Sequence, residues 1–192
     1  MSVEIDVRDE ISPLFRRATD MIASGLLTKA IGMDCSELTK SHLRALDVAR
    51  PNRLGGSRTH YYARAAASTR ADTTPGMVAI RIQQIGLRLH YYGGVVTPKI
   101  AKLLTIPATA EAHGKRAREF NDLYMAFNKA RRPYALRQKG TDKVFYWLAS
   151  KTTHLPDKSV IPSDQAYRGQ AKTTALRIIE SIRTGRRTVG GI

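Results

Sequence analysis

The chain has 192 residues, 42% of them hydrophobic, and carries 32 Lys and Arg against 16 Asp and Glu, a formal charge of +16. This length can bury one hydrophobic core, and the apolar fraction is too high for an intrinsically disordered chain. No run approaches the roughly 18 consecutive apolar residues of a membrane helix, which excludes a membrane-spanning protein. The acidic N-terminus lacks the layout of a secretory signal, and Cys35 has no partner for an internal disulfide. We therefore expect synthesis in a reducing cytoplasm.

The positive charge is concentrated after residue 49. Residues 1–49 hold six Lys and Arg against eight Asp and Glu, whereas residues 50–192 hold 26 against eight, a net charge of +18. A basic body with a slightly acidic arm predicts a polyanion beside the body and a protein contact for the arm. The alternative is a basic surface that only keeps the protein in solution.

The N-terminal part of the chain is predicted to be mainly helical. Residues 3–7 alternate apolar and acidic side chains, which indicates a short strand. A Ser-Pro pair then starts a helix over residues 13–31, and Gly32 is expected to end it. A shorter amphipathic helix that Ser36 can cap follows and ends before Pro51.

The hydrophobic period changes after a third helix. Residues 51–56 have the composition of a turn, and residues 57–70, rich in Ala and Arg, indicate a helix. Its inward-facing candidates are Tyr61, Tyr62, Ala65 and Ala66. Residues 78–82 and 87–91 alternate apolar and polar side chains, which predicts two strands in a hairpin.

A loop and a basic helix are expected next. Gly93 and Gly94 end the second strand of the hairpin, and an extended loop follows that closes with residues 103–106. Residues 110–131 are predicted to form a basic helix, although Gly114 disfavours it by about 1 kcal/mol relative to alanine. The apolar side of this helix contains Phe120, Leu123, Tyr124 and Phe127.

The C-terminal part contains a strand and a long helix. A turn at residues 139–142 leads into a strand over 143–150 that has apolar side chains on both faces, as expected of a strand covered on both sides. Ser163 is predicted to cap a helix over residues 164–183. The Gly- and Arg-rich residues 184–192 are expected to be a flexible tail.

These elements predict an α+β fold with an antiparallel sheet of about four to five strands, packed against a long N-terminal helix and a C-terminal helix. We expect one domain over residues 1–183, made of a strand and helical arm (1–49) and a basic body (50–183).

No catalytic or metal-binding constellation is visible. The five histidines are far apart in sequence, there is no pair of cysteines, and the phosphate-loop and Gly-x-Ser-x-Gly patterns do not occur. Cys35 stands beside Asp34, whose charge raises rather than lowers a thiol pKa. We therefore expect no catalytic residue, no metal and no cofactor, and we predict that the protein is not an enzyme.

Basic residues interleaved with aromatic residues are the most distinctive local feature. They occur at residues 115–118, at residues 129–134, and as Arg186 and Arg187 in the tail. Phosphate contact suits all of them, and no pattern for reading bases is present. The alternative for each is a solvated surface.

Several strings in the chain resemble the Mu-like phage virion morphogenesis, or tail-completion, family. They are PNRLGGSRTHYY (51–62), GLRLHYYGGVVTPK (86–99), LLTIPA (103–108) and YWLASK (146–151), the last followed by Pro156 and by Ile161-Pro162. The resemblance covers roughly residues 51–183, and its motifs are structural, centred on the aromatic-Gly-Gly turn and the Ile-Pro step. The N-terminal half lacks the Gly-x-x-Trp segment that many members carry.

The resemblance implies a non-enzymatic virion protein that forms a ring at the head–tail junction of a tailed phage, as a neck, tail-completion or tail-terminator subunit. Such a ring is assembled in the host cytoplasm, lets DNA pass through its lumen and contacts other neck and tail proteins. A hexamer is expected, because the tail tube of such phages is typically sixfold. Each subunit then meets two neighbours through different surfaces.

Two groups of residues receive roles from this resemblance. Tyr91, Tyr92, Gly93 and Gly94 are placed at a tight turn where the backbone approaches a neighbouring subunit, or else at a simple hairpin end within one subunit. Lys115, Arg116 and Arg118 are candidates for facing the lumen and its DNA phosphates.

Two rival functions remain open at this point. One is a non-specific nucleic-acid-binding protein, which the charge of +16 suggests and which would bind free DNA with a strong salt dependence. The other is a small enzyme, which no residue pattern favours.

Overall fold

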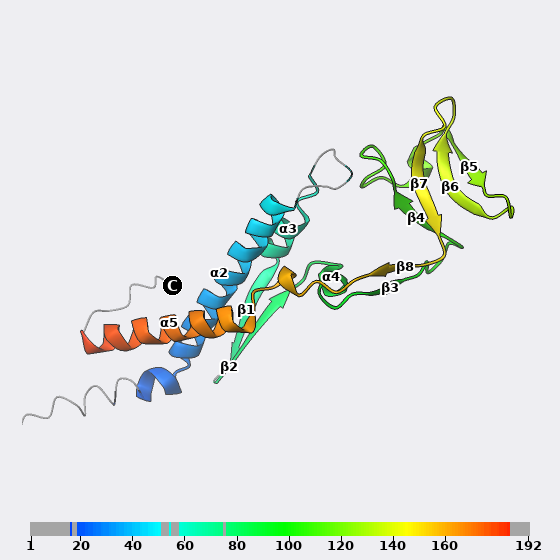
Figure 1. Cartoon of the computed structure of the whole chain (residues 1–192). Helices are drawn as coiled ribbons and strands as arrows, with labels where there is room; N and C mark the ends of the chain where they lie inside the picture. Colours follow the sequence, from blue (N-terminus) through cyan, green and yellow to red (C-terminus); the bar gives the residue numbers. More distant parts are fainter. Residues whose placement is uncertain (1–15, 17–18, 51–53, 55–57, 75, 185–192) are drawn as a thin grey trace, which may run out of the picture. The chain divides into compact units, whose positions relative to one another are not determined.

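The computed structural model describes residues 16, 19–50, 54, 58–74 and 76–184 and shows an α+β fold, as the sequence predicts (Figure 1). The helices are α2 (Leu26–Ala49), α3 (Tyr61–Ala67), α4 (Leu87–Tyr92) and α5 (Asp164–Arg183). The strands are β1 (Thr69–Thr74), β2 (Met77–Ile82), β3 (Gly94–Val96), β4 (Leu104–Pro107), β5 (Leu123–Phe127), β6 (Pro133–Gln138), β7 (Val144–Ala149) and β8 (Thr152–His154). Two short 3₁₀ turns are Ala117–Glu119 and Lys158–Val160.

The chain divides into two compact units. Unit 2 contains Leu43–Arg64 and Gln84–Val160, and unit 1 contains the described residues before, between and after these two segments. The chain passes between the units four times, inside α2, inside α3, after β2 and after Val160, and none of these boundaries coincides with the change of charge after residue 49.

Some expectations fall on residues that the structure does not describe. These are the strand at 3–7, the start of the first helix, most of the turn at 51–56 and the tail beyond residue 184. Within the described ranges, no helix has the length and apolar character that crossing a membrane requires.

The continuous helix α2 corrects the prediction of two helices separated at Gly32. The helical chain is interrupted earlier, at Gly25, whose φ of +71° is a conformation that glycine adopts without a Cβ clash. Gly32 instead lies buried within α2, where a Cβ would come within 2.5 Å of Thr73 Cγ2. This glycine permits the close approach of β1 and does not end a helix. The predicted end before Pro51 is confirmed.

Small and polar side chains form the buried stripe of α2 in unit 1. Gly32, Cys35, Ser36 and Thr39 recur at three- and four-residue spacing and are all buried. Burial, followed by the charge of Asp34, raises the pKa of the Cys35 thiol, in agreement with the sequence-based expectation.

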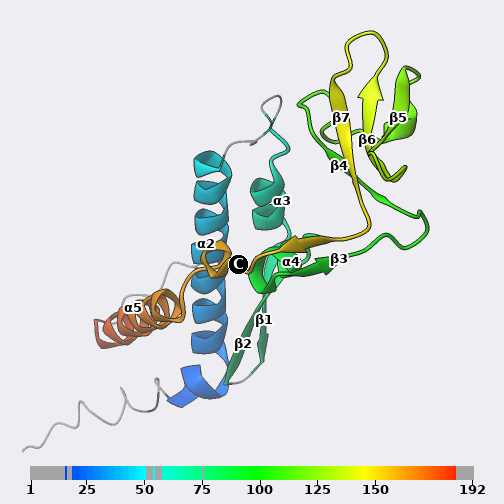
Figure 2. The same cartoon turned by 45° about the vertical axis from the view of Figure 1, so that its right-hand side comes forward.

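Helix α5 packs on α2 through hydrogen bonds. It runs over Asp164–Arg183, as predicted, and the Ser163 side chain accepts a hydrogen bond from the backbone N–H of Ala166. Thr39 Oγ1 donates to the Cys35 carbonyl (2.8 Å), so it accepts at 2.7 Å from the Tyr167 hydroxyl, because a hydroxyl carries one hydrogen. Figures 1 and 2 both show α5 crossing α2.

Asp34 adds a second polar link between these helices. Its Oδ2 accepts hydrogen bonds from Thr174 Oγ1 at 2.7 Å and from Arg177 at 2.6 Å. Thr174 is buried, so this carboxylate satisfies a hydroxyl that is removed from water.

The hairpin of unit 1 differs from the predicted one. Helix α3 ends at Ala67 rather than at residue 70, and the threonine-rich segment after it forms β1, consistent with the strand preference of β-branched residues. β1 pairs antiparallel with β2 in register from Thr69–Ile82 to Thr74–Met77. The strand at 78–82 is therefore confirmed, but its partner precedes it. The inward candidates Tyr62, Ala65 and Ala66 are buried, whereas Tyr61 is partly exposed.

Residues 87–92 form a helix, α4, which corrects the prediction of a strand at 87–91. Gly86, with φ of +88°, turns the chain immediately before α4, and Leu87 is buried. Six residues are fewer than two helical turns, so alternating apolar side chains fit a helix as well as a strand. Gly93 ends α4 with its N–H donating to the Leu89 carbonyl.

The expected extended loop after Gly94 contains a short strand. β3 pairs antiparallel with β8, in register from Gly94–His154 to Val96–Thr152. The segment expected at 103–106 forms β4, which is an edge strand of a larger sheet.

That larger sheet is antiparallel, has four strands in the order β4-β7-β6-β5, and is seen with its strands side by side in Figure 2. It corrects the prediction of a basic helix over 110–131. This segment makes turns through Gly114 (φ +79°), the 3₁₀ turn Ala117–Glu119 and then β5. Phe120 and Leu123 pack against buried Phe145 and Tyr146. Packing on the sheet therefore outweighs a helical spacing of aromatic residues.

The strand β7 at the middle of this sheet confirms the prediction at 143–150. Phe145 and Tyr146 are buried, while Trp147 is 47% exposed, so one position of the strand remains open to solvent. The predicted turn at 139–142 is also confirmed, with φ of +82° at Gly140 and +51° at Asp142.

Candidate nucleic-acid interface

The three basic residues predicted to face DNA lie on an exposed loop of the four-stranded sheet. Lys115, Arg116 and Arg118 are all exposed and flank or belong to the 3₁₀ turn Ala117–Glu119. The structure therefore brings them together on a loop, whereas the sequence placed them on a helix. Lys115 Nζ lies 5.5 Å from the centre of the Phe120 ring, a cation–π contact that leaves its charge uncompensated.

A buried tyrosine holds this loop to the sheet. The Tyr146 hydroxyl lies 3.2 Å and 3.0 Å from the carbonyl oxygens of Ala112 and Lys115 and shares its single hydrogen between them. The backbone N–H of Arg116 donates to Glu119 at 3.0 Å, which closes the turn. Burial, followed by the charge of Glu119, raises the pKa of Tyr146, so its hydroxyl keeps the proton that it donates.

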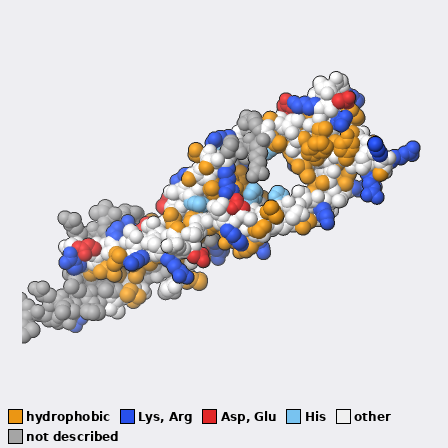
Figure 3. All heavy atoms as spheres, in the orientation of Figure 1, with side chains coloured by type: hydrophobic (Ala, Val, Ile, Leu, Met, Phe, Trp, Pro, Cys, Tyr) orange, Lys and Arg blue, Asp and Glu red, His pale blue; other side chains and the backbone are white. Residues whose placement is uncertain are grey.

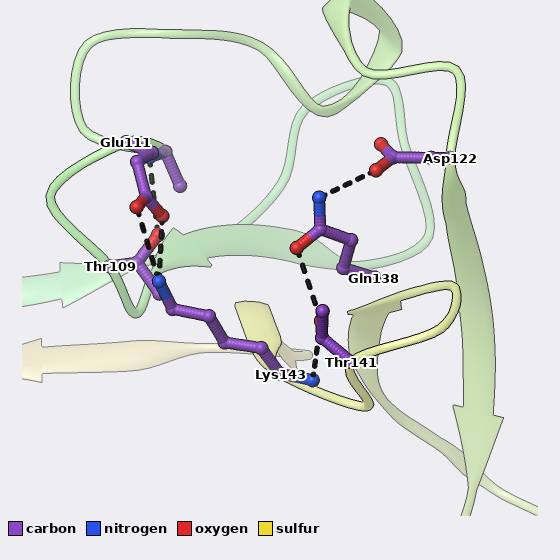
Figure 4. A network of polar contacts seen from close by, with 7 residues as sticks. Thr109, Glu111, Asp122, Gln138, Thr141 and Lys143 are labelled. Atoms are coloured by element: carbon purple, nitrogen blue, oxygen red, sulfur yellow. Dashed lines mark hydrogen bonds and ion pairs between the residues drawn. The ribbon is translucent and has the colours of Figure 1, made fainter.

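A polar network ties the same loop to the β6–β7 turn (Figure 4). Lys143 Nζ contacts both carboxylate oxygens of Glu111, at 2.9 Å and 3.2 Å, and Gln138 donates to Asp122 at 2.6 Å. Thr141 links the two pairs, because it donates to Gln138 and accepts from the backbone N–H of Lys143. The basic loop is thus fixed at both of its ends.

A fixed loop with exposed cations suits contact with phosphate groups. Within the described part of the chain, Arg118 makes no ion pair, and Glu119, the acidic residue next to it in sequence, accepts a hydrogen bond from the backbone N–H of Arg116. Guanidinium and ammonium groups that are not paired bind phosphate without reading the base sequence. The arrangement can position a nucleic-acid backbone.

The aromatic-Gly-Gly turn makes its close approach within its own chain. A Cβ on Gly93, whose φ is +70°, would lie 2.7 Å from the His154 carbonyl oxygen and from Pro156 N. The rings of Tyr91 and Tyr92 lie over the ammonium of Lys158, at 3.9 Å and 4.5 Å from their centres. Gly93 is thus required by packing in this subunit. A role of the turn in subunit contact stays a prediction.

A cleft of about 830 Å³ lies in unit 2. It is lined by Asp47, Arg50, Arg58, Thr59, His60, Tyr61, Tyr62, Arg64, His90, His113, Thr153, His154, Leu155 and Asp157. Figure 3 shows histidine side chains gathered at this part of the surface. Four of the five histidines of the chain therefore meet in one cleft, although they come from segments that are far apart in sequence. No local spacing pattern signals this cluster.

Ion pairs and hydrogen bonds hold the two carboxylates of the cleft in their charged form. Hydrogen bonds from Ser159 and then Arg50 lower the pKa of Asp157. Burial alone would raise the pKa of Asp47, but hydrogen bonds from His60 and from the backbone N–H groups of Ala63 and Tyr62 outweigh it and lower that pKa. Both carboxylates therefore stay charged and accept hydrogen bonds from other groups of the protein.

His90 lies at the centre of the cleft's aromatic group. Its ring stacks on Tyr61, with centres 5.2 Å apart, and lies 6.3 Å from the ring of His154. Burial, followed by the charges of His154 and Arg50, lowers the pKa of His90, while Asp157 partly opposes the shift. His90 is therefore neutral at neutral pH.

The histidine cluster does not form a metal site among the described residues. In those ranges, no group of three or more His, Cys, Asp and Glu side chains is placed to hold an ion. Comparisons of the chain with protein-family models, with curated proteins and with solved structures gave no match.

Proposed function

We propose that the protein is a structural subunit of a tailed-phage virion that forms a ring at the head–tail junction, through which DNA passes. The observation that carries this proposal is the exposure of large hydrophobic side chains. Among the described residues, 16 large hydrophobic side chains are exposed, whereas 12 hydrophobic residues are buried, four of them alanines. Extended exposed apolar surface marks contact with another protein.

These exposed side chains group on defined elements. On the four-stranded sheet they are Met125 and Phe127 of β5 and Trp147 of β7. Figure 3 shows hydrophobic side chains gathered over part of this sheet. On α5 they are Leu176 and Ile179, which lie about one helical turn apart and are exposed, whereas Ile178 beside them is buried. A ring subunit needs two different contact surfaces for its two neighbours, and the exposed side chains of β5 and of α5 supply one each.

Open strand edges add to these surfaces. β4 and β5 are the edges of the four-stranded sheet, and β1 and β2 pair only with each other in the described residues. A strand edge offers unpaired backbone groups to a neighbouring chain, which can extend the sheet. In a closed ring every such edge can be covered by the next subunit.

The basic loop gives the ring its DNA-facing surface. Lys115, Arg116 and Arg118 are exposed on a loop that Tyr146 holds in place. Six copies around a lumen give a ring of positive charge that attracts the phosphates of passing DNA without reading its sequence. The expected partners are further copies of the chain, neck and tail proteins, and DNA.

Replacing Lys115, Arg116 and Arg118 by Glu in a phage that carries this chain tests the DNA-facing role. The exposed positions leave the fold intact, so the ring assembles, and the yield of DNA-filled infectious particles falls because the lumen now repels DNA. A normal yield of infectious particles contradicts the assignment.

Replacing Met125 and Phe127 by Lys tests the contact surface of the sheet. Both side chains are exposed in the single subunit, so the variant folds, and we expect it to sediment as a monomer because two charges block the contact. Asn121→Lys, an exposed polar position in the turn before β5, is the matched control and retains assembly. Equal assembly of the double variant and the control contradicts this surface.

The charge of +16 favours a second candidate, a non-specific nucleic-acid-binding protein. Such a protein is expected to be a monomer that binds free duplex DNA, with an affinity that falls steeply as the salt concentration rises. A ring that forms without DNA distinguishes the first candidate from the second.

A further inference from the structure

The cleft of unit 2 has the composition of an anion site, and this observation is independent of the virion proposal. We infer that the cleft binds the phosphate group of a phosphate-bearing ligand. Three arginines and four histidines line it against two carboxylates. The lining thus has a net charge of +1 with neutral imidazoles and of up to +5 when all four histidines carry a proton.

The two carboxylates do not compete for the cations that a ligand needs. Asp157 forms an ion pair with Arg50 at 2.7 Å and accepts hydrogen bonds from Ser159. Asp47 accepts from two backbone N–H groups at 3.2 Å and contacts His60 at 3.0 Å. Each acid is therefore satisfied by groups that position the cleft wall.

The remaining cations of the cleft are available to an anion. Arg64 is exposed and makes no ion pair with a described residue, and Arg58 has only two long bonds of 3.4 Å, to the carbonyl oxygens of Asp47 and Val48. The rings of His113 and His154 make no hydrogen bond with any residue in the described ranges. One guanidinium group can donate to two phosphate oxygens at once, and imidazolium groups add further hydrogen-bond donors.

The size of the cleft indicates the class of ligand. A volume of 830 Å³ lies in the range of about 300–1,000 Å³ that small-molecule sites occupy, and it exceeds the space of one phosphate ion. The partly exposed ring of Tyr61 borders the same space. A nucleotide, or the end of a nucleic-acid strand, supplies a phosphate for the cations and a flat group for the aromatic wall.

Binding is expected to strengthen as pH falls. His90 faces Tyr61 and Tyr62 from α3, Arg50 from the segment after α2, His154 from β8 and the carboxylate of Asp157. An oxyanion in the cleft favours the protonated form of every nearby imidazole, so the complex takes up protons. For each proton that the complex takes up, the affinity for the anion rises by up to about tenfold when the pH falls by one unit.

The test is a titration of the full chain with sulfate, which keeps its charge between pH 6 and 8, and with inorganic phosphate, at constant ionic strength. We expect saturable binding that moves the imidazole proton signals in NMR spectra, at least about tenfold tighter at pH 6 than at pH 8. Arg64→Gln with His154→Gln weakens binding by about tenfold or more. Lys102→Gln with Lys172→Gln removes two exposed charges elsewhere and keeps the affinity.

Other outcomes of the titration overturn the inference. These are unmoved imidazole signals in the wild-type protein, affinities that are equal at pH 6 and pH 8, and equal losses in the two double variants. The spectra of the wild-type protein show whether the cleft binds the anion even where a variant fails to fold. A nucleoside monophosphate and a short single-stranded oligonucleotide are titrated in the same way. At least one of them must bind more tightly than sulfate, and the tighter of the two shows whether the phosphate belongs to a free nucleotide or to a nucleic-acid end.

Discussion

The two units bury different kinds of side chain. In unit 2 the four-stranded sheet closes over Phe145 and Tyr146, which are 3% and 1% exposed. In unit 1 the only large hydrophobic side chain among the buried residues described is Ile178, and α2 meets α5 through Thr39 and Asp34. Unit 2 therefore carries an aromatic core of its own, whereas unit 1 relies on close approach and hydrogen bonds.

This difference bears on assembly. Unit 1 places large hydrophobic side chains such as Leu26, Met33, Leu176 and Ile179 on its surface and small ones inside. Because apolar burial is the main source of stability, a unit built in this way gains most from a partner that covers its outer side chains. Unit 1 is the part that we expect assembly to stabilise most.

The largest expected effect is at the aromatic core. Phe145→Ala removes a buried ring and lowers the free energy of unfolding by about 3–5 kcal/mol. Trp147, the single tryptophan of the chain, neighbours this site, so urea unfolding followed by its fluorescence measures the loss. A change below about 1 kcal/mol would mean that the sheet has no core of its own, and the contrast between the units would disappear.

A smaller effect is expected at the close approach of α2 and β1. Gly32→Ala favours the helix by about 1 kcal/mol but forces its Cβ against Thr73 Cγ2, so the single substitution destabilises the protein. On a Thr73→Ser background, which lacks that carbon, Gly32→Ala becomes stabilising by about 1 kcal/mol. Thermal unfolding followed by circular dichroism measures both. The same sign in both backgrounds argues against the close approach.

The hydrogen bond between α2 and α5 comes next. Tyr167→Phe removes the hydroxyl that donates to Thr39 and is expected to lower the free energy of unfolding by about 1 kcal/mol. Thr39→Val with Tyr167→Phe removes both partners and should cost less than the sum of the two single substitutions. Additive losses in this double-mutant cycle would show that the contact does not link the helices.

The smallest effect concerns pH and unit 2. The folded chain lowers the pKa of His90, so the unfolded chain binds more protons between that pKa and the ordinary value of about 6.5. Stability is therefore full above pH 6.5 and falls as the pH drops through this window. His90→Gln should flatten the change in the urea midpoint between pH 7 and 5. An unchanged profile contradicts the burial of a neutral imidazole.

The sequence predicted elements that local signals define. Helix α5 was predicted with its bounds, because Ser163 caps it and an apolar period runs over its 20 residues. The segment 110–131 was wrong, since the spacing of Phe120, Leu123 and Phe127 fits a helix locally and only packing on Phe145 and Tyr146 selects a turn and a strand.

The candidate sites follow the same rule. Lys115, Arg116 and Arg118 are neighbours in sequence, so their clustering was predictable even though the element that carries them was not. His60, His90 and His154 meet only because β8 and α4 return to the region of α3, and no spacing in the sequence contains that information.

The most direct test of the proposed ring is the mass of the purified protein in solution, measured by light scattering at low and high salt, with and without duplex DNA. We expect a closed oligomer close to six times the subunit mass of 21.3 kDa, formed without DNA and retained in high salt, because hydrophobic contacts hold it. A monomer under all conditions that binds duplex DNA with a steep salt dependence would contradict it.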